Sequence, residues 1–158
     1  VYGGLQNTFT ICRNLVLGVY FSYSFGGSMY NLSELYIGGS SSSYNKYRYL
    51  LDSWHPVRNP NSNIPRAFTD DGLGSSRFVH DASFIRLKTV SLSYRFDLYQ
   101  KTKYIRNITI GISGENLFLW KNYNGFDPDV STSTAARRID NGAYPKARTV
   151  VFNFSITY

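Results

Sequence analysis

Apolar side chains at every second position are the feature that most constrains the fold of this chain. The clearest row ends the sequence, where smaller or polar residues separate its members, Val150, Phe152, Phe154, Ile156 and Tyr158. Successive side chains of a β-strand point to opposite faces of a sheet, so this period predicts a strand with an apolar outward row. A helix would instead place apolar residues three and four positions apart.

The same period recurs upstream and predicts five strands in all. A second row runs from Leu15 to Phe25. In the third strand, Leu87 is out of phase with the row that begins at Val90, which indicates a β-bulge near Lys88. The expected fold class is therefore all-β and antiparallel. The predicted strands cover residues of about 4–12, 15–30, 84–97, 105–119 and 149–158.

The connections between these strands alternate between short and long. Residues 12–14 and 98–104 are short links, whereas residues of about 31–83 and 120–148 are long loops that hold most of the acidic residues. Outer-membrane β-barrels show this arrangement, with short periplasmic turns and long extracellular loops. We therefore expect a transmembrane β-barrel segment whose C-terminus lies on the periplasmic side.

A lipid environment explains both the alternation and the loops. Lipid cannot hydrogen-bond a backbone or solvate a charge, so a spanning sheet closes on itself and keeps its lipid face apolar. Aromatic residues gather near the strand ends, where an interfacial girdle would lie. A soluble β-sandwich with facing apolar rows explains the alternation equally well, and a cell-surface carbohydrate-binding module of that kind is the alternative. The order of the loops favours the membrane protein.

Five strands are too few to close a barrel. The smallest single-chain barrels have about eight strands, so the predicted sheet has two open edges that would be costly in lipid. The sequence also starts at Val1 without an initiator methionine or a signal peptide. We therefore expect a piece of a longer protein, with the remaining strands in residues outside this sequence or on another chain.

Four stretches of the sequence carry a resemblance to a known family. They are SFIRLKTVSLSY at 83–94, GENLF at 114–118, YNGFDPDV at 123–130 and GAYP at 142–145. In this order and spacing, followed by an aromatic C-terminal strand, they resemble the end of a SusC/RagA-type TonB-dependent outer-membrane transporter of the Bacteroidetes. Two upstream segments, at 3–9 and 53–56, are similar to that family too, so the resemblance covers nearly the whole chain.

The resemblance implies functions that the alternation of apolar and polar residues does not imply. Members of this family are barrels of about 22 strands with an N-terminal plug, a segment that engages TonB, and a SusD-like surface lipoprotein that caps the barrel as a lid. They import oligosaccharides or peptides. The plug and the TonB box are absent from this sequence, so residues 1–158 would supply the C-terminal part of the barrel wall with its extracellular loops. The implied partners are the remaining strands and plug, the SusD-like lipoprotein, TonB through the absent N-terminal part, and outer-membrane lipid and lipopolysaccharide.

The family stretches also imply a set of residues with a structural role. Asp127 and Asp129 are two positions apart and could share a hard cation, but no further regularly spaced oxygen ligands accompany them. A turn nucleated by proline and aspartate explains this sequence better, so we expect no metal site and no cofactor. The residues with an implied structural role are Glu115, Asn116, Asp127, Pro128, Tyr144 and Pro145.

The sequence offers no recognisable catalytic centre and no nucleic-acid motif. His55 and His80 are the only histidines, and no serine or cysteine nucleophile motif accompanies them, so we do not expect an enzyme. The net charge is +7, and a basic run occurs at Ala136, Arg137 and Arg138. The basic residues are otherwise scattered, which suits anionic lipopolysaccharide or acidic substrates better than nucleic acid.

The first long loop is the best candidate for binding a substrate. Residues 36–49 are rich in tyrosine and serine and include Asn45, and aromatic faces beside amides and hydroxyls suit stacking on sugars or contact with peptides. Packing against the lid lipoprotein or against neighbouring loops is the alternative. A short helix is expected at about 45–53. The residues predicted to contact substrate or lid are Tyr36, Tyr44, Tyr47, Tyr49 and Trp54.

Overall fold

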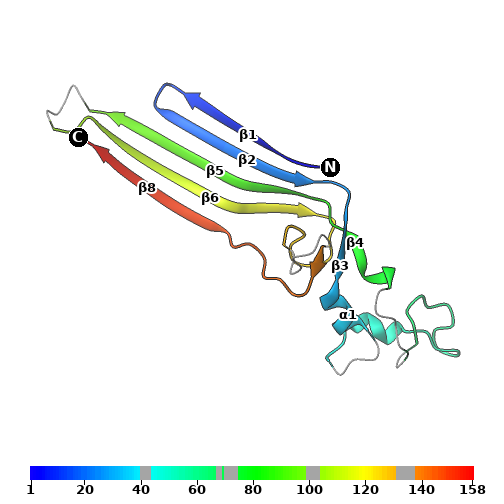
Figure 1. Cartoon of the computed structure of the whole chain (residues 1–158). Coiled ribbons are helices and arrows are strands. Elements are labelled where there is room, and N and C mark those ends of the chain that lie inside the picture. The colour runs from blue at the N-terminus through cyan, green and yellow to red at the C-terminus, as the bar shows by residue number, and fades with distance from the viewer. Residues whose placement is uncertain (40–43, 67–68, 70–74, 99–103, 131–137) are drawn as a thin grey trace. The chain divides into compact units, whose positions relative to one another are not determined.

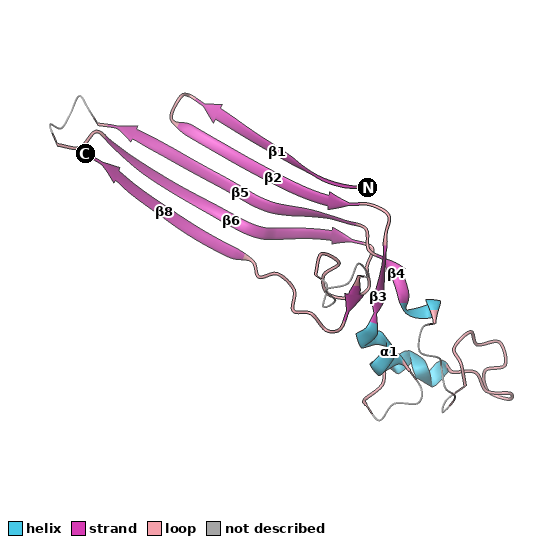
Figure 2. Cartoon of the chain, in the orientation of Figure 1, coloured by secondary structure: helices cyan, strands magenta, loops and turns pink. Residues whose placement is uncertain are grey.

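The computed structural model describes residues 1–39, 44–66, 69, 75–98, 104–130 and 138–158 (Figure 1). These residues form two compact units. The sheet unit consists of Val1–Gly27, Ser83–Asn122 and Pro145–Tyr158, and the loop unit consists of Ser28–Ala82 and Tyr123–Tyr144. Strands make up most of the regular structure (Figure 2). No helix in the described residues has the length and apolar character needed to cross a membrane.

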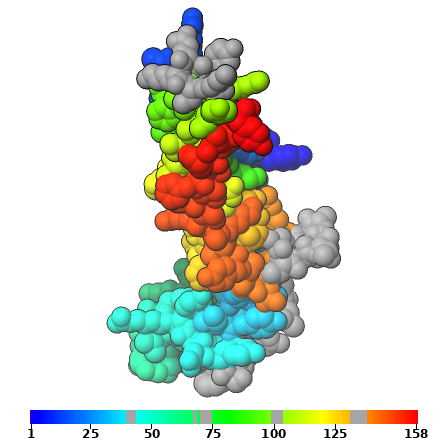
Figure 3. All heavy atoms as spheres, turned by 90° about the vertical axis from the view of Figure 1, so that its left-hand side faces the viewer, coloured from blue at the N-terminus to red at the C-terminus, as the bar shows by residue number. Residues whose placement is uncertain are grey.

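The sheet unit is one five-stranded antiparallel sheet in the order β1-β2-β5-β6-β8. This confirms the expected all-β, antiparallel class. Figure 3 shows β8, in red, lying open at the surface. The strands are β1 (Tyr2–Ile11), β2 (Leu15–Ser24), β5 (Phe84–Asp97), β6 (Asn107–Lys121) and β8 (Thr149–Thr157).

A tight turn joins β1 to β2. Cys12 and Arg13 both have left-handed backbone angles, with φ of 52° and 66°. Positive φ at both central positions matches the right-handed twist of the strands that a hairpin connects. The turn places Ile11 opposite Leu15 and so sets the register of the whole hairpin.

The predicted second strand, at about 15–30, is too long. The structure ends β2 at Ser24 because the chain turns at Gly26 and Gly27, whose φ angles are 67° and 134°. The next strand, β3 (Ser28–Asn31), pairs in a different sheet. The other four strands differ from the expected ranges by at most two residues at either end.

The expected bulge near Lys88 is confirmed. Between Leu87 and Thr89 the register shifts against both neighbours, so Lys88 is an extra residue of β5 relative to β2. Over the same interval β6 advances by three residues, from Glu115 to Phe118, and so carries one extra residue relative to β5. These insertions bring the out-of-phase part of β5 back to the same face as the rest of its apolar row.

The loop unit contains more regular structure than the sequence predicts. A small sheet in the order β4-β3-β7 combines β3 with β4 (Val79–Asp81) and β7 (Ile139–Asp140). Helix α1 (Leu32–Gly38) follows β3 directly, and the side chain of Asn31 caps it by accepting a hydrogen bond from the backbone N–H of Glu34 at 2.9 Å. Residues of about 31–83, expected as one long extracellular loop with a short helix, thus also contain helix α1 and strand β4.

Two short 3₁₀ helices complete the loop unit. One covers Arg48–Asp52, within the region where a short helix was expected, and the other covers Ser76–Phe78. The core of this unit includes Met29, Phe78 and Tyr123, all essentially without exposed surface. Its buried centre thus gathers side chains from segments that are far apart in the sequence.

Candidate functional site

The sheet unit presents one continuous apolar face. Leu17 lies opposite Leu92, Leu92 lies opposite Ile112, and Ile112 lies opposite Phe152. Residues directly opposite each other project from the same face of a sheet, so the predicted apolar rows of all these strands align. The outward row of β8 is thus part of this face.

This apolar face is exposed rather than covered. The side chains of Leu92 and Ile112 are each 41% exposed, and Phe152 is 79% exposed. A β-sandwich core would bury such rows against a second sheet, whereas an apolar patch of this extent marks a surface that meets lipid or another protein. The exposure therefore disfavours the soluble sandwich. The other exposed apolar members on this face include Tyr94, Phe96, Ile110, Phe118, Trp120, Val150, Phe154 and Ile156.

The opposite face of the sheet is polar and carries small side chains. Gly18, Ser91 and Ser113 lie opposite one another across three strands. Nearer the bulge, the ammonium group of Lys88 lies 5.5 Å from the centre of the Tyr20 ring. The sheet thus has one apolar face and one face of small and polar side chains.

Aromatic pairs lie near both ends of the apolar face. At one end the rings of Phe118 and Trp120 are 5.9 Å apart, and at the other the rings of Tyr94 and Phe96 are 4.5 Å apart. On β5, Ile85 lies opposite Trp120 and so marks one end of the apolar face, while Tyr94 marks the other. At about 3.3 Å per residue, the distance along β5 from Ile85 to Tyr94 is roughly 30 Å. At a barrel tilt of about 40° this span is about 23 Å deep, close to the apolar band of roughly 25 Å of outer-membrane barrels.

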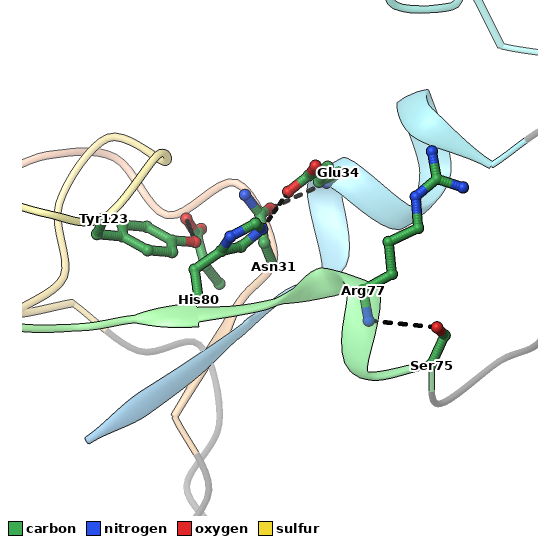
Figure 4. Close-up of polar contacts among 7 residues, drawn as sticks. Asn31, Glu34, Ser75, Arg77, His80 and Tyr123 are labelled. Carbon is green, nitrogen blue, oxygen red and sulfur yellow. Dashed lines mark hydrogen bonds and ion pairs between the residues drawn. The ribbon is translucent and has the colours of Figure 1, made fainter. Parts of the chain in front are cut away.

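A buried polar cluster holds the loop unit together (Figure 4). Nε2 of His80 lies 2.5 Å from Oε2 of Glu34, which joins β4 to α1. The hydroxyl of Tyr123 donates to Oδ2 of Asp140 at 2.8 Å. Burial, followed by the hydrogen bond to Asp140, raises the pKa of Tyr123 well above its ordinary value. The cluster connects segments more than 40 residues apart, and sequence reasoning missed it because no local pattern pairs its members.

The tyrosines predicted to contact substrate or lid fall into two separate pairs. The rings of Tyr36 and Tyr44 meet edge to face at 6.2 Å, and both line a hollow of about 440 Å³. The rings of Tyr47 and Tyr49 are stacked at 5.6 Å. Tyr49 is partly buried, and burial raises the pKa of its hydroxyl. The first pair therefore offers more accessible ring surface than Tyr49 does.

Trp54 lies apart from those tyrosines. It lines a second hollow, whose other members include Arg58, Asn59 and Arg66. Sequence reasoning did not select these polar residues, although their proximity to Trp54 in the chain was a usable signal.

Three of the residues with an implied structural role lie at a bulge or a turn. Asn116 has a φ of 53° within the β6 bulge, and its amide donates to the carbonyl oxygen of Ala147 at 3.1 Å. Asp127 is 1% exposed, and its Oδ1 accepts a hydrogen bond from the backbone N–H of Asp129 at 3.0 Å, which forms an Asx turn. Pro128 is fully buried beside it.

The remaining members of that set are Glu115, Tyr144 and Pro145, of which Glu115 and Tyr144 are exposed. In the described part of the chain, no group of three or more histidine, cysteine and acidic residues is arranged to hold a metal ion. Residues 136 and 137 of the basic run lie outside the described residues.

Comparisons with known proteins find several relatives, although no protein-family model matches the chain. The chain is 32% identical over 165 residues to the TonB-dependent receptor P26 of Formosa agariphila, a match that covers 98% of the chain and 16% of that receptor. It is 30% identical over 86 residues to the TonB-dependent receptor SusC of Bacteroides thetaiotaomicron, which covers 53% of the chain and 8% of SusC. The chain thus spans about a sixth of the length of the relatives that it matches along most of its residues.

Solved structures share the fold. The RagAB peptide importer in its open-open state matches 99% of the chain and 17% of its own chain, with a TM-score of 0.80 and 23% sequence identity. The closed-closed state of that importer gives the same TM-score at 22% identity. The arrangement described above therefore occurs as one part of a much larger protein.

Proposed function

Because this chain belongs to the TonB-dependent receptors of the SusC/RagA type, we propose that its sheet unit forms a section of the barrel wall of an importer in the bacterial outer membrane. The transported substrate would be an oligosaccharide or a peptide. The RagAB neighbour, named as a peptide importer, favours the second, and the tyrosine-lined hollow suits either. We propose no enzymatic activity.

The exposed apolar face is the observation that carries this proposal. A sheet with one apolar and one polar face is stable in lipid only when its backbone groups are paired and its apolar face contacts the acyl chains. In the five-stranded sheet β1 and β8 are the two edge strands. We propose that further strands of the same importer pair with these edges and complete the barrel.

The loop unit would lie on the extracellular side and the turn at Cys12 on the periplasmic side, together with the C-terminus. A SusD-like lipoprotein would cover the loops as a lid. A plug domain would fill the barrel, and TonB would supply energy through an N-terminal part that these residues do not include. Lipid and lipopolysaccharide would surround the apolar face, as expected from the aromatic pairs at its two ends.

Purification of the intact protein that contains this chain tests the proposal. We expect the protein in the outer-membrane fraction, and we expect it to need detergent to stay monodisperse. A protein that is monodisperse in plain buffer would overturn the membrane assignment. Loss of oligosaccharide or peptide uptake in cells that lack the protein then identifies which substrate class it carries.

A further inference from the structure

The segment around Trp54 is a preformed loop in the loop unit. The backbone N–H of Trp54 donates to the carbonyl of Ile64 at 2.8 Å, which brings the two arms of the segment together. His55 and Asn59 exchange two backbone hydrogen bonds of 3.3 and 3.1 Å. Nδ1 of His55 also accepts from the backbone N–H of Arg58 at 3.2 Å. A loop fixed in this way loses little conformational entropy when a ligand binds.

The indole of Trp54 is held in one orientation and stays accessible. Its Nε1–H donates to the carbonyl oxygen of Pro60 at 3.0 Å, and the side chain is 38% exposed. Because the polar atom of the ring is already bonded, the remaining exposed surface is an apolar aromatic face. Such a face suits stacking of a flat apolar surface.

The hollow beside this indole is small and cationic. It has a volume of about 230 Å³ and is lined by Leu51, Ser53, Trp54, His55, Arg58, Asn59 and Arg66. Ligand pockets for whole small molecules measure about 300–1,000 Å³, so this hollow fits one unit of a longer chain.

The charged residues that line the hollow are both arginines. Arg58 and Arg66 line it and no aspartate or glutamate of the described ranges does, while Asp52 lines another hollow together with Arg58. Among the residues that the structure describes, the exposed guanidinium of Arg58 has no carboxylate partner. A guanidinium presents a planar fork of donors that matches carboxylate and sulfate groups.

We propose that this hollow binds one acidic sugar unit of an oligosaccharide. The sugar ring stacks on Trp54, its carboxylate or sulfate binds Arg58 with support from Arg66, and Asn59 contacts a hydroxyl group. A saccharide fits better than an acidic peptide because the hollow combines one fixed aromatic plane with polar groups and has only Leu51 as a further apolar side chain. This inference rests on the proposed import function and narrows its substrate class.

Binding to the intact detergent-solubilised protein tests the inference by calorimetry. The probes are a tetragalacturonate, which carries carboxylates, a κ-carrageenan tetrasaccharide, which carries sulfates, the fully methyl-esterified tetragalacturonate as a neutral control, and a tetraglutamate peptide. We expect at least one acidic saccharide to bind, with affinity that falls as salt rises, and the ester to bind at least about tenfold more weakly. The better of the two acidic probes identifies the anionic group.

Arg58→Gln should weaken binding of the acidic saccharide by about 10-fold or more. Arg48→Gln is the matched control, because Arg48 is exposed in the same segment but does not line the hollow. It should change binding less than about twofold. Trp54→Phe, which keeps an aromatic ring, should retain part of the affinity if the loop stays folded.

Several outcomes would overturn the inference. These are tighter binding of tetraglutamate than of either saccharide, equal effects of the two arginine variants, equal binding of the ester, and binding of no probe at all. If Arg58→Gln fails to fold, as judged by lost β-sheet circular dichroism, Arg66→Gln replaces it, and it should weaken binding of the acidic saccharide more than Arg48→Gln does. These outcomes would contradict the acidic-sugar site alone if the protein still needs detergent and fractionates with the outer membrane. The proposed import function would then be unaffected.

Discussion

Arginine substitutions at two neighbouring positions of β8 test which face of the sheet meets lipid. Phe152 and Asn153 are consecutive, so their side chains project from opposite faces. Phe152 lies opposite Ile112, which pairs with Leu92. Phe152 therefore lies inside the span between the aromatic pairs but closer to its Tyr94 end. An arginine on the lipid face near the bilayer midplane costs about 2–4 kcal/mol. This cost falls toward the interfaces, so Phe152→Arg should reduce the folding equilibrium constant by about one to two orders of magnitude, and Asn153→Arg should have a much smaller effect.

The assay is equilibrium unfolding of the intact protein in phospholipid vesicles, followed by tryptophan fluorescence across a denaturant series. The two variants carry the same added charge on the same strand, so only the face differs. Equal loss of stability in both variants would refute the two-faced assignment. A larger loss for Asn153→Arg would place lipid on the opposite face.

Four further predictions concern the bulge, the buried cluster, its pH dependence and the turn. Asn116→Ala should cost about 1–3 kcal/mol, since it removes the bond to Ala147 and places an alanine in a left-handed conformation; Asn116→Gly should cost less, and equal unfolding midpoints for the two would contradict this. Tyr123→Phe should destabilise the loop unit by about 1–3 kcal/mol because it removes a donor from buried Asp140, as measured by limited proteolysis. Because the pKa of Tyr123 is raised on folding, the native state keeps its proton while the unfolded chain loses it, so stability should decline above about pH 10, and less in the Tyr123→Phe variant. Cys12 is exposed in its turn, so in a parent protein without other cysteines a membrane-impermeant maleimide should label it only after the outer membrane is permeabilised; labelling of intact cells would contradict the periplasmic position.

Local periodicity was enough to predict the sheet unit. A period of two assigns the residues of β8, and those of β6 up to Glu115, to a face without reference to any other strand, and the slip between Leu87 and Val90 locates the bulge of β5. The extra residue of β6 has no such signal. The same rule overextended β2, because the period alone continues past Ser24 and takes no account of the backbone turn at Gly26. A periodic pattern thus predicts which face a side chain occupies more reliably than it predicts where a strand ends.

The loop unit was less predictable because its structure depends on distant contacts. β7 has only two residues and exists through pairing with β3, more than 100 residues earlier. The pairing of Glu34 with His80 likewise has no local signature. The aromatic residues of the loop were recognised as a set, but proximity in the sequence did not predict that the structure would separate Tyr36 from Trp54 into different hollows.

At the bulge, each strand from β2 to β5 to β6 has one residue more than the strand before it. An insertion or deletion in one of these strands therefore changes its pairing with the next. β5 exceeds β2 by one residue at Lys88, and β6 exceeds β5 by one more near Asn116. Deleting Lys88 alone would leave two unmatched residues on β6 and disturb the pairing with Phe118. A second deletion, of Asn116 or Leu117, would restore the present offset between the two strands. Gaps at these two places should therefore be gained or lost together when related sequences diverge, and a deletion in one strand should be a genetic suppressor of a deletion in the other.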